Sequence, residues 1–143
     1  MSFDLRLKGG DLALGSNRDL STVEGSEKLV QEVLKIVSTD LGGNPFFPWY
    51  GCPISQSLVG TSYPTNFIAS VASTQLRTSL ETLQKMQKVQ LSDGQVVTPQ
   101  EQIAAVQDVF VARNAVDPRF FVITLTVLSK AFRTVQTSLQ VSL

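Results

Sequence analysis

The spacing of hydrophobic residues divides the chain into extended and helical segments. At the N-terminus, apolar side chains occupy every second position over residues 3–7 and again over 12–14, on either side of Gly9-Gly10. A period of two is typical of β-strands, and the paired glycines favour a tight turn. The pattern therefore predicts a β-hairpin with one buried face, followed by a short extended segment over 18–23.

Helical spacing begins at Ser26. Apolar residues recur three and four positions apart over 26–41, which predicts an amphipathic helix that ends at Gly42-Gly43. The same spacing predicts a second, longer helix within 64–92. A third helix is predicted from Thr98 onward, because Thr98, Pro99 and Glu101 have the pattern of a capping box and apolar residues follow over 103–110.

Alternation returns at the C-terminus, where residues 120–129 and 133–143 both read as strands. The order is thus a β-hairpin, helices and a second β-hairpin. This order predicts an α+β fold, with one domain over residues 1–143. We expect the N-terminal and C-terminal hairpins to form one sheet that packs on about three helices.

Composition narrows the function classes. The chain has 143 residues, and its 12 basic and 12 acidic side chains cancel. A neutral chain lacks the basic surface expected of a nucleic-acid binder or an anionic-membrane binder. Its apolar runs are far shorter than the roughly 20 residues of a membrane span, and its N-terminus lacks the pattern of a signal peptide. We therefore expect no nucleic-acid partner and no membrane partner.

The chain contains no histidine and only one cysteine, Cys52. These absences remove Ser-His and Cys-His nucleophile pairs, histidine-containing zinc sites and thiolate metal clusters. The acidic residues are scattered, and their spacing singles out no pair of the kind that glycoside hydrolysis needs. The sequence predicts no catalytic residues, no cofactor and no metal site, and we expect a protein that is not an enzyme.

Asp117-Pro118-Arg119 stands directly before the first C-terminal strand. Pro118 disfavours a helical conformation at the preceding residue, so the three residues form a corner. The corner could satisfy itself through a local ion pair, could contribute a carboxylate to catalysis, or could bind a partner. Catalysis is disfavoured because a neighbouring guanidinium lowers the pKa of a carboxyl group and makes it a poor general acid.

The last strand carries serine, threonine and glutamine on its polar face, and no charge or proline follows Arg133. Charged residues and prolines are the usual protection of an exposed sheet edge. An unprotected edge can accept a strand from another chain by β-augmentation. The alternative is that this strand lies inside the sheet.

Four aromatic residues, Phe46, Phe47, Trp49 and Tyr50, lie between Pro45 and Pro53. They could cover the open end of the core. Alternatively, they form an exposed aromatic anchor for a partner.

Three stretches resemble a known family. They are GDLAL (10–14), VEGSEKLVQEVLKIVSTDLGGNPFFPWYG (23–51) and Asp117-Pro118-Arg119 before a strand. The resemblance, which extends over nearly the whole chain, is to the small wedge protein of contractile-tail baseplates. That family includes the phage sheath initiator and its type VI secretion counterpart, and its members are often labelled lysozyme-like. The family motif is usually Glu-Pro-Arg, so Asp117 replaces a glutamate here.

The resemblance implies a structural role. The motif would engage the helical core bundle of larger wedge subunits, with Arg119 as charge-assisted donor, Asp117 as its orienting acceptor and Pro118 fixing the corner. The first ring of tail sheath protein would add onto the terminal strand, at Val135, Thr137, Leu139, Gln140, Val141 and Leu143. The protein would occupy the baseplate of a virion in several copies with six-fold symmetry, after assembly in the host bacterial cytoplasm. The alternative function is a peptidoglycan-degrading tail lysozyme.

Overall fold

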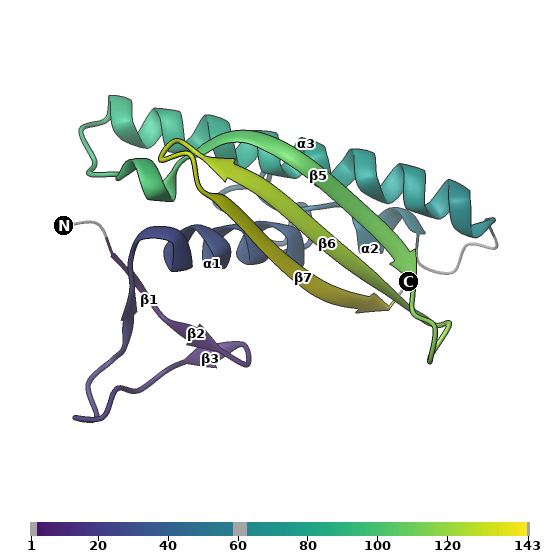
Figure 1. The fold of residues 1–143 in the computed structure, drawn as a ribbon, viewed down its shortest axis with the longest axis horizontal. Helices are drawn as coiled ribbons and strands as arrows, with labels where there is room; N and C mark the ends of the chain where they lie inside the picture. Colours follow the sequence, from purple (N-terminus) through teal and green to yellow (C-terminus); the bar gives the residue numbers. More distant parts are fainter. Residues whose placement is uncertain (1–2, 59–62, 143) are drawn as a thin grey trace.

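A computed structural model describes residues 3–58 and 63–142 and has an α+β fold (Figure 1). The elements, in chain order, are β1 (Asp4–Leu5), β2 (Leu7–Lys8), β3 (Asp11–Leu12), β4 (Thr22–Val23), α1 (Gly25–Ser38), α2 (Ile54–Leu58), α3 (Thr65–Ser92), the 3₁₀ turn η1 (Pro99–Glu101), β5 (Ile103–Arg113), β6 (Phe120–Ser129) and β7 (Thr134–Ser142). The predicted fold class, the two long helices and the two C-terminal strands are confirmed.

One antiparallel sheet of order β5-β6-β7 lies across α1 and α3 (Figure 1). Helix α3 packs against β5, and α1 packs against β7. Along β6 the side chains alternate between fully and partly buried positions, as expected for a central strand with one face on the helices. The core consists mainly of aliphatic residues from these layers, including Leu29, Ile36, Leu76, Leu80, Ile123 and Leu125.

The predicted third helix is wrong. Residues 103–113 form strand β5, and the capping box starts only the single turn η1. The register of β5 against β6 shifts twice, between Ile103 and Ala105 and between Val106 and Asp108. Each β-bulge inserts an extra residue, so the buried positions are spaced irregularly and imitate a helical period. Besides α1 and α3, the described residues form one short α-helix, α2, which lies between them in the chain and which the hydrophobic spacing did not predict.

The expectation of one sheet built from both chain ends is also wrong. Strands β2 and β3 form a hairpin around Gly9-Gly10, as predicted, but β1 pairs with β4 and none of the four joins the C-terminal sheet. These four strands and their connections, the N-terminal arm (residues 3–23), also lack the predicted buried apolar face. Each strand has only two residues, and Val23 is the one buried hydrophobic residue among those described in the arm. Six of its hydrophobic side chains are exposed: Phe3, Leu5, Leu7, Leu12, Leu14 and Leu20.

Candidate functional site: a free sheet edge and the corner beside it

Strand β7 is an edge of the C-terminal sheet. Its nine residues pair with β6 in one unbroken register, from Leu128↔Thr134 to Phe120↔Ser142. In the described part of the chain, no strand pairs with its other side. The predicted open edge is therefore present. Leu143, which the sequence assigned to the same edge, lies outside the described residues.

Hydrogen bonds at the ends of β6 determine where the amides of β7 point. At the β6–β7 turn, the N–H of Ser129 donates to the carbonyl of Arg133 at 2.9 Å. Ser129 and Arg133 are therefore a hydrogen-bonded pair. Bonded and non-bonded pairs alternate along an antiparallel ladder, so the next bonded residues of β7 are 135, 137, 139 and 141, and the odd-numbered residues bond to β6. At the opposite end of β6, the N–H of Asn114 donates to the carbonyl of Phe120. The even-numbered residues of β6 therefore bond to β5. This leaves its odd-numbered residues to bond to β7, in agreement with the first assignment. The unpaired backbone groups of the free edge belong to Thr134, Gln136, Ser138, Gln140 and Ser142.

The predicted edge residues thus differ in how they face the open side. Val135, Thr137, Leu139 and Val141 direct their backbone toward β6 and their side chains toward the helices, where Val135 is buried and the other three are half-buried. Gln140 directs its N–H and C=O outward. The other even-numbered residues of β7 also direct their N–H and C=O groups away from β6. The sequence could not identify these residues, because alternation alone does not say whether the odd-numbered or the even-numbered backbone groups point to the open side.

The other edge of the sheet, β5, is less suited to accept a strand. Its two bulges interrupt the ladder, and Asp108 and Arg113 place charges along it. Bulges and charges are the means by which natural proteins protect edges. Strand β7 has neither over its nine residues. The two edges of one sheet therefore differ in their protection, and β7 is the unprotected one.

Asp117 and Arg119 form a closed local pair in the β5–β6 loop. The Nε and Nη2 atoms of Arg119 donate to the two carboxylate oxygens of Asp117 at 3.1 and 2.9 Å, and the backbone N–H of Arg119 donates to Oδ1 at 3.0 Å. Hydrogen bonds from Arg119 lower the pKa of the Asp117 carboxyl group, and the same contact raises the pKa of the guanidinium. The loop is held further by Arg113, whose Nη1 donates to the carbonyl of Pro118 at 2.9 Å.

The corner is self-satisfied but remains accessible. The side chain of Arg119 is 81% exposed although its carboxylate partner fixes its direction. The pair Phe120↔Ser142 places the corner beside the C-terminal end of β7. The structure thus brings together two of the predicted sites, at one end of the sheet.

The aromatic segment lies against the C-terminal half of α3. Phe46, Phe47 and Trp49 are exposed, whereas Tyr50 is half-buried and packs on the core. Burial raises the pKa of the Tyr50 hydroxyl. The rings of Phe47 and Trp49 meet edge to face, with their centroids 5.8 Å apart. The same two rings border a groove of about 820 Å³, which is also lined by Met86 and Val89 of α3. Three of the four rings are therefore available at the surface.

Gly51 fixes the end of this segment. Its φ of +125° is in the region that favours glycine, and a Cβ atom there would lie 2.7 Å from the carbonyl oxygen of Thr39. The close approach allows the N–H of Cys52 to donate to the same carbonyl at 2.8 Å. The aromatic segment is thereby held against the end of α1.

A buried polar cluster, which the sequence did not reveal, joins α1, α3 and η1. The Nζ atom of Lys28 lies 3.3 Å from Glu101 and 3.9 Å from Glu32. Glu101, whose side chain is 1% exposed, also accepts from the N–H of Gly25, at 3.2 Å. Gln87 donates to Glu32 and to the carbonyl of Glu101, at 3.0 and 2.8 Å. The only hint in the sequence was the capping box, in which Glu101 accepts from the N–H of Thr98.

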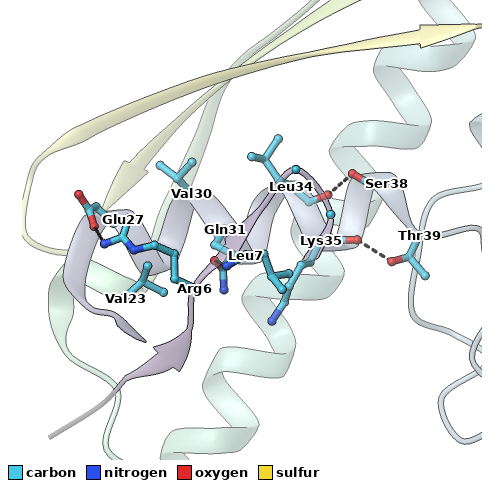
Figure 2. Close-up of a pocket in the computed structure, with 12 residues that line it drawn as sticks. Arg6, Leu7, Val23, Glu27, Val30, Gln31, Leu34, Lys35, Ser38 and Thr39 are labelled. Atoms are coloured by element: carbon cyan, nitrogen blue, oxygen red, sulfur yellow. Dashed lines mark hydrogen bonds and ion pairs between the residues drawn. The ribbon is translucent and has the colours of Figure 1, made fainter. Parts of the chain in front are cut away.

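The N-terminal arm is attached to α1 through polar contacts (Figure 2). Gln31 acts as a strand partner, because its Oε1 accepts from the N–H of Leu7 and its Nε2 donates to the carbonyl of Leu5. Ion pairs of 2.7 Å join Arg6 to Glu27 and Lys35 to Asp4. The arm and the helix enclose a groove of about 610 Å³.

Residues 3–58 and 63–142 contain neither a metal-binding cluster nor a membrane-spanning helix. No group of three or more Cys, Asp or Glu residues in these ranges is placed to hold a metal ion. None of the helices described there has the length and apolar composition needed to cross a membrane.

Comparisons with known proteins reveal a similarity of fold. No family model matches the chain, and no curated protein matches it. Among solved structures, the chain is similar to a protein from Geobacter sulfurreducens described as a "putative tail lysozyme". The two share 11% identity with a TM-score of 0.62, and the alignment covers 93% of this chain and 96% of that one. The likeness establishes a shared fold over nearly the full length of both proteins.

Proposed function

We propose that this chain is a structural protein of a contractile-tail baseplate that nucleates assembly of the tail sheath. In this role, β7 receives a strand of the first sheath ring by β-augmentation. The observation that carries the proposal is the free edge of β7, which offers five residues with outward backbone groups and has no bulge, charge or proline. Such an edge is exceptional in a monomer unless a partner covers it.

The corner supplies a second attachment, to the larger wedge subunits. A guanidinium has five N–H donors, and Asp117 engages two nitrogens of the Arg119 guanidinium. The remaining donors belong to an exposed group that Asp117 and Pro118 already hold in one direction. A pre-oriented cation of this kind suits a carboxylate on a partner, since little side-chain freedom is lost on binding. The exposed rings of Phe46, Phe47 and Trp49 are a candidate third contact.

This function implies several copies in a six-fold symmetric baseplate. The protein would belong to a virion tail and would assemble in the host bacterial cytoplasm. Its likeness in fold to a protein described as a tail lysozyme is consistent with a place in a phage-like tail.

The name of that neighbour also favours a second candidate, a peptidoglycan hydrolase. Such an enzyme uses two carboxyl groups that face each other across an accessible cleft, one of which donates a proton. Glu32 and Glu101 are a close carboxylate pair, but both flank the ammonium group of Lys28 inside the protein. Glu101 is held as an acceptor by backbone and lysine donors. The contacts of this pair favour a structural role, and we propose that the chain has no muralytic activity.

Proline substitution provides a direct test. Gln140→Pro removes an outward donor, and the structure predicts that the sheet itself keeps all its hydrogen bonds. When baseplates carrying this variant are mixed with sheath subunits, electron microscopy should show few or no full-length sheaths, whereas the variant still joins the wedge. Gln140→Ala is the control, because it changes the same side chain and retains the amide. Normal sheath growth on Gln140→Pro and Ser138→Pro baseplates would contradict the proposal.

A second assay separates the two candidate functions. The purified protein should leave peptidoglycan intact in a dye-release measurement. Release that is abolished by Glu32→Gln or Glu101→Gln in a variant that remains folded would establish the hydrolase instead.

A further inference from the structure

A groove of about 300 Å³ lies beneath the C-terminal half of β7. Leu139 and Val141 of β7 and Ile123 of β6 form its sheet side. The opposite side is formed by the last turn of α1 and the start of α2, through Val37 and Ile54. The groove therefore lies beside the edge whose backbone groups are unpaired.

The groove exists because α1 ends before β7 does. The helix stops at Ser38, and burial of the inward side chains of β7 decreases along the strand. Val135 is buried, whereas Leu139 and Val141 are only half-buried. On the neighbouring strand, the residue opposite Leu139 is Ile123, which is fully buried. Two apolar side chains of the edge thus lack the cover that the central strand has.

We propose that this groove receives one branched aliphatic side chain from the strand that pairs with β7. The inference rests on the function proposed above and specifies which strand the edge accepts. A residue placed opposite Leu139 would share its face of the sheet and point toward the helices. In β-augmentation, backbone hydrogen bonds provide affinity, and pockets for alternate side chains provide specificity.

The residues around the groove favour an aliphatic side chain. Six of its ten lining residues are apolar, namely Val37, Cys52, Ile54, Ile123, Leu139 and Val141, and Cys52 is buried. Its polar residues are mostly exposed, and the single charge among them, Asp40, already accepts a hydrogen bond from the hydroxyl of Ser55. An acidic side chain would meet the carboxylate of Asp40, and a polar one would lose hydrogen bonds to water without replacement.

The groove also provides a register for the added strand. On the face of the sheet away from the helices, the side chains of β7 are all neutral and polar. A partner strand that slipped by two residues would therefore make nearly the same contacts on that face. An apolar side chain that fits only beneath Leu139 and Val141 removes this ambiguity.

Two labelled peptides test the proposal against the full chain. In both, threonine alternates with alanine, and one central alanine is replaced by leucine in the second peptide. We expect the leucine peptide to bind about tenfold more tightly by fluorescence anisotropy (about 1.4 kcal/mol). Hydrogen exchange should show protection of the outward amides of Ser138 and Gln140 on binding.

Two variants test whether the preference for the leucine peptide comes from the face of β7 that carries the groove. Leu139→Phe fills the groove and should abolish the preference for leucine, whereas Thr124→Phe adds the same ring to the opposite face of the sheet, on the neighbouring strand β6, and should preserve it. Equal binding of both peptides to the unmodified chain, with the edge amides protected, would overturn the groove and leave strand addition intact. If neither peptide binds at millimolar concentration, strand addition fails and the groove fails with it.

Discussion

A pair of adjacent proline substitutions tests the direction of the β7 backbone. Thr137 and Ser138 are neighbours near the middle of the strand, opposite Leu125 and Thr124 of β6. The N–H of Thr137 points toward β6, and that of Ser138 points to the open side. Both substitutions introduce the same ring, so a difference in stability between them reports the orientation of the lost donor.

The two substitutions should lower the free energy of unfolding by amounts that differ about threefold. Thr137→Pro leaves the carbonyl of Leu125 without its donor, which costs about 1–3 kcal/mol. It also directs the proline ring toward the neighbouring strand, where a central ladder does not accommodate it. We expect a total loss of about 3 kcal/mol. Ser138→Pro removes no ladder bond and should cost about 1 kcal/mol or less.

Thermal unfolding measures the difference. For a domain of this size, 1 kcal/mol corresponds to about 3 °C in Tm, so Thr137→Pro should lower Tm by about 9 °C and Ser138→Pro by at most about 3 °C. Thr137→Ala and Ser138→Ala are the controls for loss of the side chains. Equal losses for the two prolines, or a greater loss for Ser138→Pro, would refute the assignment of the outward amides and the site built on it.

Three further predictions concern other parts of the molecule. Arg119→Ala should change Tm little, because the ion pair is exposed, yet weaken a pull-down with wedge subunits by about tenfold or more; normal binding would exclude the corner as a contact. Phe132 has φ of +59° and is 89% exposed, so Phe132→Gly should relieve left-handed strain and raise Tm by about 3 °C, whereas a lower Tm would reveal a contact that stabilises the turn. Burial raises the pKa of Glu32, so its carboxyl group contributes stability below pH 4.5 that is lost as pH rises through the folded-state pKa. Glu32→Gln should therefore raise Tm at pH 7 and give no advantage below pH 4.5, and a lower Tm at pH 7 would show that its ion pair outweighs its desolvation.

Local patterns in the sequence predicted the elements whose residues interact mainly with near neighbours. The periodic apolar positions of α1 and α3, the turn at Gly9-Gly10 and the alternation of β6 and β7 all appear in the structure. Asp117-Pro118-Arg119 was recognised as a corner for the same reason, since proline geometry and a pair two residues apart are local properties. The free edge of β7 was anticipated from the absence of charge and proline.

The sequence could not determine features that depend on which segments meet. Residues 103–113 have apolar spacing close to that of a helix, and only pairing with β6, with its two bulges, makes them a strand. The N-terminal hairpin has the same alternation as a sheet strand, but polar contacts with α1 hold it apart from the C-terminal sheet.

The chemistry of the candidate site shows the same division. The alternation over 134–142 says that successive residues face opposite ways, but it has a period of two and cannot say which parity faces the open side. One hydrogen bond of the turn, from Ser129 to Arg133, decides that question. The groove beneath Leu139 exists because α1 stops at Ser38, on an element about a hundred positions away in the chain. Sequence periodicity determined that residues 134–142 form a strand; tertiary contacts determined that this strand is an edge and which of its atoms are free to bind.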